Sequence, residues 1–159
     1  MAERDRAADA RVARLPAFSL PATCGTLNSE ALAGIPLVLY FYPKDATPGC
    51  TTQASDFRDL AGEFKDAGVR VVGVSRDTLA SHQRFRERER LPFDLIADTD
   101  EVLCSQFDVV RDKNMYGRSV RGIQRSTFLF DRAGNLRQAW RGLKVPGHVA
   151  TVLAAARAL

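Results

Sequence analysis

Residues 36–42 read PLVLYFY, and this nearly continuous apolar run decides the fold class. Such runs are typical of strands that are buried on both faces of a parallel sheet. A second run of this kind, VRVVGVS, covers residues 69–75, and a shorter one covers residues 93–97. Helical patterns separate the three runs. This alternation predicts an α/β protein with a parallel sheet at its centre and helices on the faces of the sheet.

The segments around these strands carry helix and hairpin signals. An apolar stripe with the spacing i, i+3, i+4 and i+7 is formed by Phe57, Leu60, Ala61 and Phe64. The stripe predicts one helix that begins after Thr47 and ends at Gly68, a suitable C-terminal glycine. Further helices are predicted over residues 78–90, 101–107 and 147–159, a strand over 17–20, and an antiparallel hairpin over 126–130 and 136–140.

Length and composition fit one domain with a core of its own. The 159 residues are 45% hydrophobic and 26% charged, which is close to the average for globular proteins. Residues 1–13 show no packing pattern and predict a flexible tail, which leaves residues 14–159 as the domain. No apolar segment has the length of a membrane span or the form of a secretory signal, so we expect no membrane contact.

Charge and cysteine content indicate which partners and which compartment to expect. The net charge is +4, but acidic residues are mixed with basic ones, as in RFRERER at residues 84–90. Such a run is typical of a solvated helix face, and no nucleic-acid partner is expected. The three cysteines, Cys24, Cys50 and Cys104, are odd in number and widely spaced. They do not form a disulfide framework and favour a reducing, cytoplasmic location.

Residues 43–50 read PKDATPGC and place a cysteine at the start of a helix. Thr47 suits the N-cap and Pro48 the first helical position, so Cys50 falls in the first turn. The helix dipole favours a thiolate there, but it contributes only about 0.3–1 kcal/mol at an exposed site, so a nearby cation is also expected. A lone cysteine is more often a small buried hydrophobe. This setting instead favours a nucleophile at the carboxyl end of a buried strand.

These residues resemble the peroxiredoxin active-site motif: a proline, three residues, a threonine or serine, two residues and a cysteine. The wider runs YFYPKDATPGCT, GVSRD, NMYG and RSTF resemble one branch of that family, the bacterioferritin comigratory proteins or peroxiredoxins Q. The resemblance covers nearly everything after Leu15. It implies a thioredoxin-like fold, with a central mixed sheet and helices on both faces. It also implies an antioxidant thiol-dependent peroxidase that reduces hydrogen peroxide and organic hydroperoxides. We expect no cofactor and no metal.

The resemblance implies roles for four residues. Cys50 matches the peroxidatic cysteine, which becomes a sulfenic acid. Thr47 matches the hydroxyl that hydrogen-bonds the peroxide, and Pro43 matches the residue that shields the thiolate from water. Arg125 matches the arginine that holds the thiolate and polarises the O–O bond. A guanidinium suits that task because it stays charged and offers several donors in a fixed fork.

The chain departs from the family pattern at the resolving cysteine. Members of this branch carry it five residues after the first cysteine or on the next helix, where this chain has Ser55 and Arg86. Cys104 is expected in the core, and Cys24 lies in a predicted turn region at residues 24–34. Either could resolve only if the bridging geometry allowed it. We therefore expect a monomeric one-cysteine enzyme whose sulfenic acid is reduced by thioredoxin, glutaredoxin or glutathione.

Three other functions stay open from the residues alone. A thiol–disulfide oxidoreductase would need Cys-x-x-Cys, but Cys50 is followed by TTQ. A zinc site would need ligands at finger or ribbon spacing, which the cysteines and histidines lack. His82 is expected on the polar face of its helix, and His148 near the start of the last helix. A non-enzymatic holdase role would leave no motif.

Overall fold

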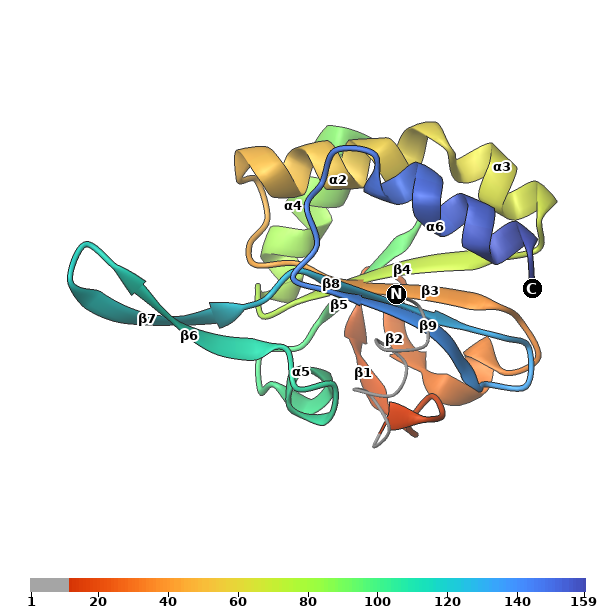
Figure 1. Cartoon of the computed structure of the whole chain (residues 1–159), viewed down its shortest axis with the longest axis horizontal. Helices are drawn as coiled ribbons and strands as arrows, with labels where there is room; N and C mark the ends of the chain where they lie inside the picture. The colour runs from red at the N-terminus through yellow and green to blue at the C-terminus, as the bar shows by residue number, and fades with distance from the viewer. Residues whose placement is uncertain (1–11) are drawn as a thin grey trace.

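The computed structural model describes residues 12–159, and its centre is a seven-stranded sheet in the order β2-β1-β5-β4-β3-β8-β9 (Figure 1). The parallel middle consists of β3 (Leu37–Phe41), β4 (Arg70–Ser75) and β5 (Asp94–Ala97). On the other side of β3, β8 (Ser126–Phe130) and β9 (Leu136–Arg141) add antiparallel strands. Every residue of β3 is buried, because the strand lies at the centre of a sheet that is covered on both faces.

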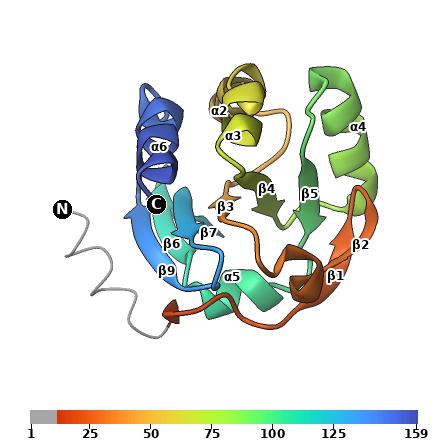
Figure 2. The same cartoon turned by 90° about the vertical axis from the view of Figure 1, so that its right-hand side faces the viewer.

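Helices cover both faces of this mixed sheet (Figures 1 and 2). One face carries α2 (Pro48–Asp59), α3 (Ala61–Asp66), α4 (Leu79–Glu89) and α6 (His148–Arg157). The other carries α5 (Val102–Gln106). Alternate residues of β3 contribute to two apolar cores, one on each side of the sheet. Within residues 12–159, no helix combines the length and apolar character needed to cross a membrane.

The amino-terminal part forms an edge of the sheet. β1 (Ser19–Ala22) and β2 (Gly25–Asn28) make a hairpin, and a short 3₁₀ helix, η2 (Ser29–Leu32), follows. The strand predicted over residues 17–20 therefore begins two residues later than expected. The predicted tail falls largely on residues 1–11, outside the described part of the chain. Val12, within the same prediction, is buried in the core.

The single helix predicted from Thr47 to Gly68 is instead two helices. α2 and α3 meet at Leu60, whose backbone leaves the helical region with φ −103° and ψ 9°. The apolar stripe still faces one core, since the rings of Phe57 and Phe64 lie 5.8 Å apart. Gly68 has a φ of +74°, the left-handed conformation that favours glycine just after a helix.

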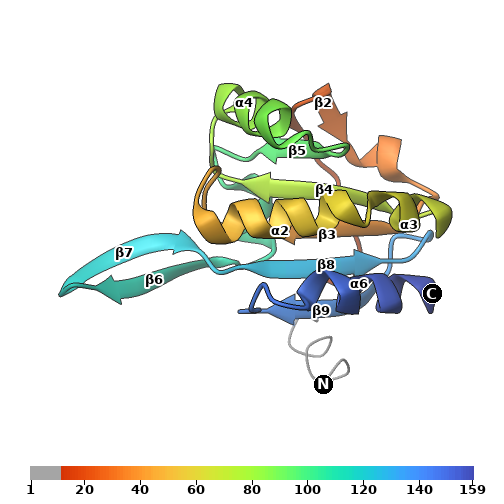
Figure 3. The same cartoon turned by 90° about the horizontal axis from the view of Figure 1, so that it is seen from above.

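A two-stranded arm was not identified from the sequence. β6 (Val110–Met115) and β7 (Arg118–Ile123) pair antiparallel and project away from the body of the molecule (Figures 1 and 3). Tyr116 and Gly117 form the turn with φ values of 53° and 77°, as in a type I′ hairpin. The arm carries mostly polar and charged side chains and has no buried face along most of its length. Hydrophobic alternation therefore gives little signal for these strands.

Candidate active site

Cys50 lies in the first turn of α2, just after the loop that leaves β3. Thr47 occupies the N-cap position with an extended backbone, and Pro48 is the first helical residue, as the sequence predicts. The Cys50 side chain is only 2% exposed. The loop opens at the carboxyl end of the parallel strands, which is where open α/β sheets bind their ligands.

Arg125 reaches Cys50 from the short connection between β7 and β8. Its Nη2 lies 3.4 Å from the Cys50 Sγ, and its Nη1 donates to Oε1 of Gln53 at 2.6 Å. Gln53 follows Cys50 by one helical turn on the same side of α2, so it fixes the guanidinium beside the sulfur. Gly49 leaves room for this approach, since a Cβ there would lie 3.2 Å from Nη2. The cation expected beside Cys50 is therefore supplied by Arg125.

The other two predicted site residues lie in the loop before α2. Pro43 and Thr47 are both partly exposed. The Thr47 side chain does not cap α2; its Oγ1 instead donates to the carbonyl of Lys44 at 2.8 Å. The structure thus brings Thr47 and Cys50 together at the start of one helix, with Pro43 in the loop that leads to it.

A buried hydrogen-bond network ties this loop to α4. The Tyr42 hydroxyl donates to Oδ1 of Asp45 at 2.6 Å, and the Ser81 hydroxyl donates to Oδ2 at 2.8 Å. Nδ1 of His82 lies 2.7 Å from the same Oδ2. Burial alone would raise the pKa of the Asp45 carboxyl. The hydrogen bond and charge of His82, helped by the two hydroxyls, outweigh burial, and this pKa is lowered.

The prediction that His82 lies on a polar helix face is wrong, because the side chain is fully buried. Its two ring nitrogens face acceptors: Nδ1 faces Asp45, and Nε2 lies 2.9 Å from the carbonyl of Ile96. Asp77 sits beside this pair and accepts from the backbone N–H of Asp45 at 2.9 Å. Ligand atoms of Asp45, Asp77 and His82 lie within 4.8 Å of one another and could hold a cation. Hydrogen bonds within the protein already use these atoms.

Two buried polar atoms in this region lack a hydrogen-bond partner among the described residues: the Tyr40 hydroxyl and Nε2 of Gln53. Burial raises the pKa of Tyr40, and the charges of Cys50 and Asp45 raise it further. Tyr40 therefore stays a neutral phenol at working pH. Gln53 keeps an uncommitted donor while its oxygen holds Arg125.

The remaining cysteines lie in contrasting surroundings, and all three thiols are free. Cys24 is exposed between β1 and β2, and Cys104 is fully buried in α5, as the sequence predicts. Burial raises the pKa of the Cys104 thiol well above its ordinary value, and the charge and hydrogen bond of Asp98 add to the effect. Cys104 is therefore a protonated core residue in the folded protein.

His148 begins α6, as predicted, and is buried close to Arg125. Its Nε2 lies 2.8 Å from Oγ1 of Thr127, and its ring meets Trp140 edge to face at 5.6 Å between centroids. Burial first, and then the charge of Arg125, lower the pKa of His148 to about 4. The imidazole is therefore neutral at pH 7.

A cysteine in the first turn of a helix, beside an arginine and at the end of a central parallel strand, defines a thiol-dependent oxidoreductase. The AhpC/TSA family model matches residues 13–139, and the chain belongs to this family. The peroxiredoxin Bcp of Xanthomonas campestris is 51% identical over 152 residues, covering 92% of this chain and 95% of that protein. The peroxiredoxin Bcp of Bacillus subtilis is 48% identical over 128 residues, covering 80% and 82%.

Solved structures agree with this assignment. Peroxiredoxin Q of Xanthomonas campestris matches with a TM-score of 0.84 at 50% identity, over 89% of this chain and 90% of that one. Peroxidoxin BcpB of Mycobacterium tuberculosis matches with a TM-score of 0.81 at 32% identity, over 92% and 95%. The fold is thioredoxin-like, as expected, and the chain is a thiol-dependent peroxidase that uses a peroxide substrate and a thiol reductant.

Sequence reasoning missed three residues that shape this site. Gln53 had a usable signal, because a residue three positions after Cys50 on a helix lies on the same side. Asp45 lies in the motif loop itself, but nothing local indicated its partner. His82 gave a misleading signal, since its sequence neighbours are polar while its own side chain is buried.

Proposed function

We propose that Cys50 reduces hydrogen peroxide and organic hydroperoxides through a sulfenic acid. The observation that carries this proposal is the Arg125 Nη2, 3.4 Å from the Cys50 Sγ and braced by Gln53. A fixed positive charge at this distance stabilises a thiolate. It also stabilises the negative charge that develops on oxygen as the O–O bond breaks.

The residues around Cys50 support one sequence of steps. The thiolate attacks one peroxide oxygen, so that an S–O bond forms as the O–O bond breaks. The second oxygen takes up a proton and leaves as water or an alcohol, and Cys50 becomes a sulfenic acid. The Thr47 hydroxyl donates a hydrogen bond to the backbone carbonyl of Lys44, and the lone pairs of its oxygen therefore remain free to accept from the O–H of the peroxide. Pro43, partly buried in the same loop, limits the access of water.

The cycle we propose uses one cysteine and an external thiol. That thiol attacks the sulfenic sulfur and expels water, and a second thiol then reduces the mixed disulfide, releasing Cys50 and an oxidised reductant. Cys104 is buried with a raised thiol pKa. Cys24 follows Thr23, whose backbone N–H donates to the carbonyl of Leu95 near the amino end of β5. Because β5 runs parallel to β3, Cys24 lies at the opposite end of the sheet from Cys50.

We propose further that thioredoxin, glutaredoxin or glutathione regenerates Cys50. The protein then works as a monomer in the cytoplasm. The free state of Cys24, Cys50 and Cys104 supports a reducing compartment. The position of Cys50 near Arg125 of the same chain supports a site that needs no second copy.

The direct test is the intact mass of the protein after one equivalent of hydrogen peroxide without added thiol. We expect the gain of one oxygen, mapped to Cys50, and no gain in a Cys50→Ser variant. A Cys24→Ser, Cys104→Ser double variant should keep full turnover. Loss of two hydrogens would contradict the one-cysteine cycle, and an unchanged mass would contradict the whole proposal.

A further inference from the structure

The outer part of the β6–β7 arm has no packing partner among the residues that the structure describes. All described side chains between residues 112 and 121 are exposed, and Tyr116 at the turn is 100% exposed. An isolated two-stranded ribbon is only marginally stable in water. Contacts at its base therefore fix it: Arg121 forms an ion pair with Glu101, and Nη2 of Arg76 donates to the Arg121 carbonyl at 3.2 Å. The hydrogen bond from Arg121 lowers the pKa of Glu101 to about 2.

The strand register divides the side chains of the arm between two faces. Directly paired residues share a face, and successive residues alternate. The anchored face consists of Asp112, Asn114, Ser119 and Arg121. The opposite face, called here the cationic face, includes Arg111, Lys113, Arg118 and Val120. Its outer cations, Lys113 and Arg118, form no ion pair with any residue from 12 to 159 that the structure describes. The anchored face balances its charges, whereas the cationic face has no acidic residue.

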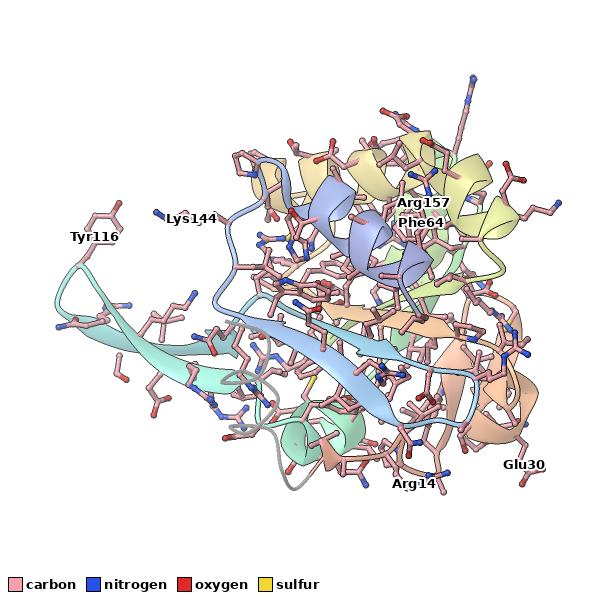
Figure 4. All side chains as sticks on the ribbon, turned by 45° about the vertical axis from the view of Figure 1, so that its right-hand side comes forward. Arg14, Glu30, Phe64, Tyr116, Lys144 and Arg157 are labelled. Carbon is pink, nitrogen blue, oxygen red and sulfur yellow. The ribbon has the colours of Figure 1, made fainter. Side chains whose placement is uncertain are left out.

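The arm lies at the same end of the molecule as Cys50. Figures 1 and 3 both show the arm extending from the end of the sheet where α2 begins. Only Gln124 separates β7 from Arg125, whose guanidinium contacts Cys50. Lys144, an exposed cation in the loop before α6, projects on the same side as Tyr116 in Figure 4. A protein that approaches Cys50 from this end meets a positively charged surface.

We propose that the cationic face docks an acidic protein thiol, and that this thiol reduces oxidised Cys50. The inference rests on the proposed peroxidase cycle. Unpaired cations on an exposed surface accelerate association with a negatively charged partner. Tyr116 and the 43%-exposed Val120 offer apolar contact beside those cations, and exposed tyrosines of this kind are enriched at the centres of interfaces. A small neutral thiol needs no docking surface. The arm therefore affects the rate of reduction by a protein thiol and leaves the rate of reduction by a small thiol unchanged.

The test uses a Lys113→Glu, Arg118→Glu double variant of the full chain. Its kcat/KM is measured with a thioredoxin of net negative charge and its NADPH-dependent reductase, and separately with dithiothreitol. At low ionic strength we expect a loss of about tenfold or more with thioredoxin. The rate with dithiothreitol should not change. Added salt should lower the wild-type kcat/KM for thioredoxin and affect the variant much less.

A matched control places the same change in charge at the far end of the sheet, in a Lys65→Glu, Arg132→Glu double variant. Both positions are exposed, and this variant should keep its kcat/KM for thioredoxin within about twofold, since distant charges are screened. Equal losses in the two double variants would overturn the proposal in favour of net charge. Equal losses with both thiols would overturn it in favour of an effect on Cys50 itself.

Two further outcomes are distinguishable. A wild-type dimer that the Lys113→Glu, Arg118→Glu change dissociates would assign the cationic face to a second copy and overturn the docking proposal. If wild-type protein consumed no peroxide even with dithiothreitol, the proposed function would fail instead, independently of the arm.

Discussion

Cys50 and Cys104 are both buried in helices, on opposite faces of the sheet, but the charges beside them have opposite signs. Cys50 is 2% exposed and lies 3.4 Å from a guanidinium nitrogen of Arg125. Cys104 is 0% exposed, and burial together with the carboxylate of Asp98 raises its thiol pKa. Burial is nearly equal at the two sites. The sign of the nearest fixed charge therefore distinguishes the proposed nucleophile from a core residue.

Each of the two sites also holds a buried aspartate, and these differ in what they bind. Asp98 accepts the backbone N–H groups of Val102 and Cys104, both at 2.8 Å, and so stabilises the start of α5. Asp45 instead accepts from side chains, namely Tyr42 three residues before it and Ser81 on α4, and Nδ1 of His82 on α4 lies 2.7 Å from its Oδ2. The Asp98 contacts are local and fix a helix end. The Asp45 contacts with α4 join residues 36 and 37 positions apart in the sequence, and they fix the position of a loop.

The largest expected effect comes from replacing each of the two cysteines in a separate variant. Cys50→Ser should lower peroxidase turnover by on the order of 10³-fold or more, as loss of a nucleophile does. Cys104→Ala should leave turnover within about twofold and lower only the stability, by about 1 kcal/mol. Steady-state peroxide consumption with dithiothreitol checks both variants. Comparable losses of activity in the two would remove the basis of the comparison.

Removing the positive charge at Cys50 should have the next largest effect. Arg125→Gln should lower kcat/KM for peroxide by on the order of 10²-fold, the usual cost of removing a donor that stabilises a developing negative charge. Arg137→Gln is the matched control, because that arginine pairs with Asp131 on the surface. It should leave kcat/KM unchanged. Stopped-flow peroxide reduction measures both, and an unaffected Arg125→Gln variant would show that burial, rather than charge, sets the reactivity of Cys50.

The tether between Asp45 and His82 should appear as a loss of stability. His82→Leu leaves a buried carboxylate without the imidazole that contacts it at 2.7 Å and should lower the free energy of unfolding by about 3 kcal/mol. Adding Asp45→Asn in the same chain should recover part of that loss, because the two residues act as a pair. Urea denaturation measures all three variants, with Asp45→Asn alone completing the cycle. Strictly additive losses would mean that the two side chains stabilise the loop independently.

The smallest expected effect is the pH dependence of stability that comes from His148, which is buried near Arg125. The folded pKa of His148 is about 4, below its ordinary value, so between pH 6.5 and 4 the unfolded chain binds more protons than the folded one. Stability should therefore fall as the pH is lowered through this window, by at most about 2 kcal/mol at pH 5. Urea denaturation from pH 8 to pH 5 checks the slope.

His148→Gln should flatten that slope, and Arg125→Gln should reduce it, since the guanidinium contributes to the lowered pKa of His148. A slope that survives His148→Gln unchanged would assign the pH dependence to other groups. It would also contradict the electrostatic coupling between Arg125 and His148.

Elements with local signals were predicted best. The buried run at residues 36–42 gave β3, and Thr47 and Pro48 correctly placed the start of α2. The break at Leu60 was missed because the apolar stripe continues across it, so periodicity could not reveal that the helix ends there. The arm was missed because neither face of its outer strands is buried, which removes the alternation that identifies most strands.

The sequence by itself determined a central parallel sheet and a cysteine in the first turn of a helix. Both follow from local patterns: apolar runs, a capping residue and a proline. Local patterns did not indicate which groups face that cysteine: Arg125 was expected there from the family resemblance alone, and the tertiary structure brought Gln53 to brace it. Arg125 comes from 75 residues further along the chain, and His82 becomes buried through contacts with two other segments. Such contacts depend on how distant segments pack together, and local spacing carries no direct record of that packing.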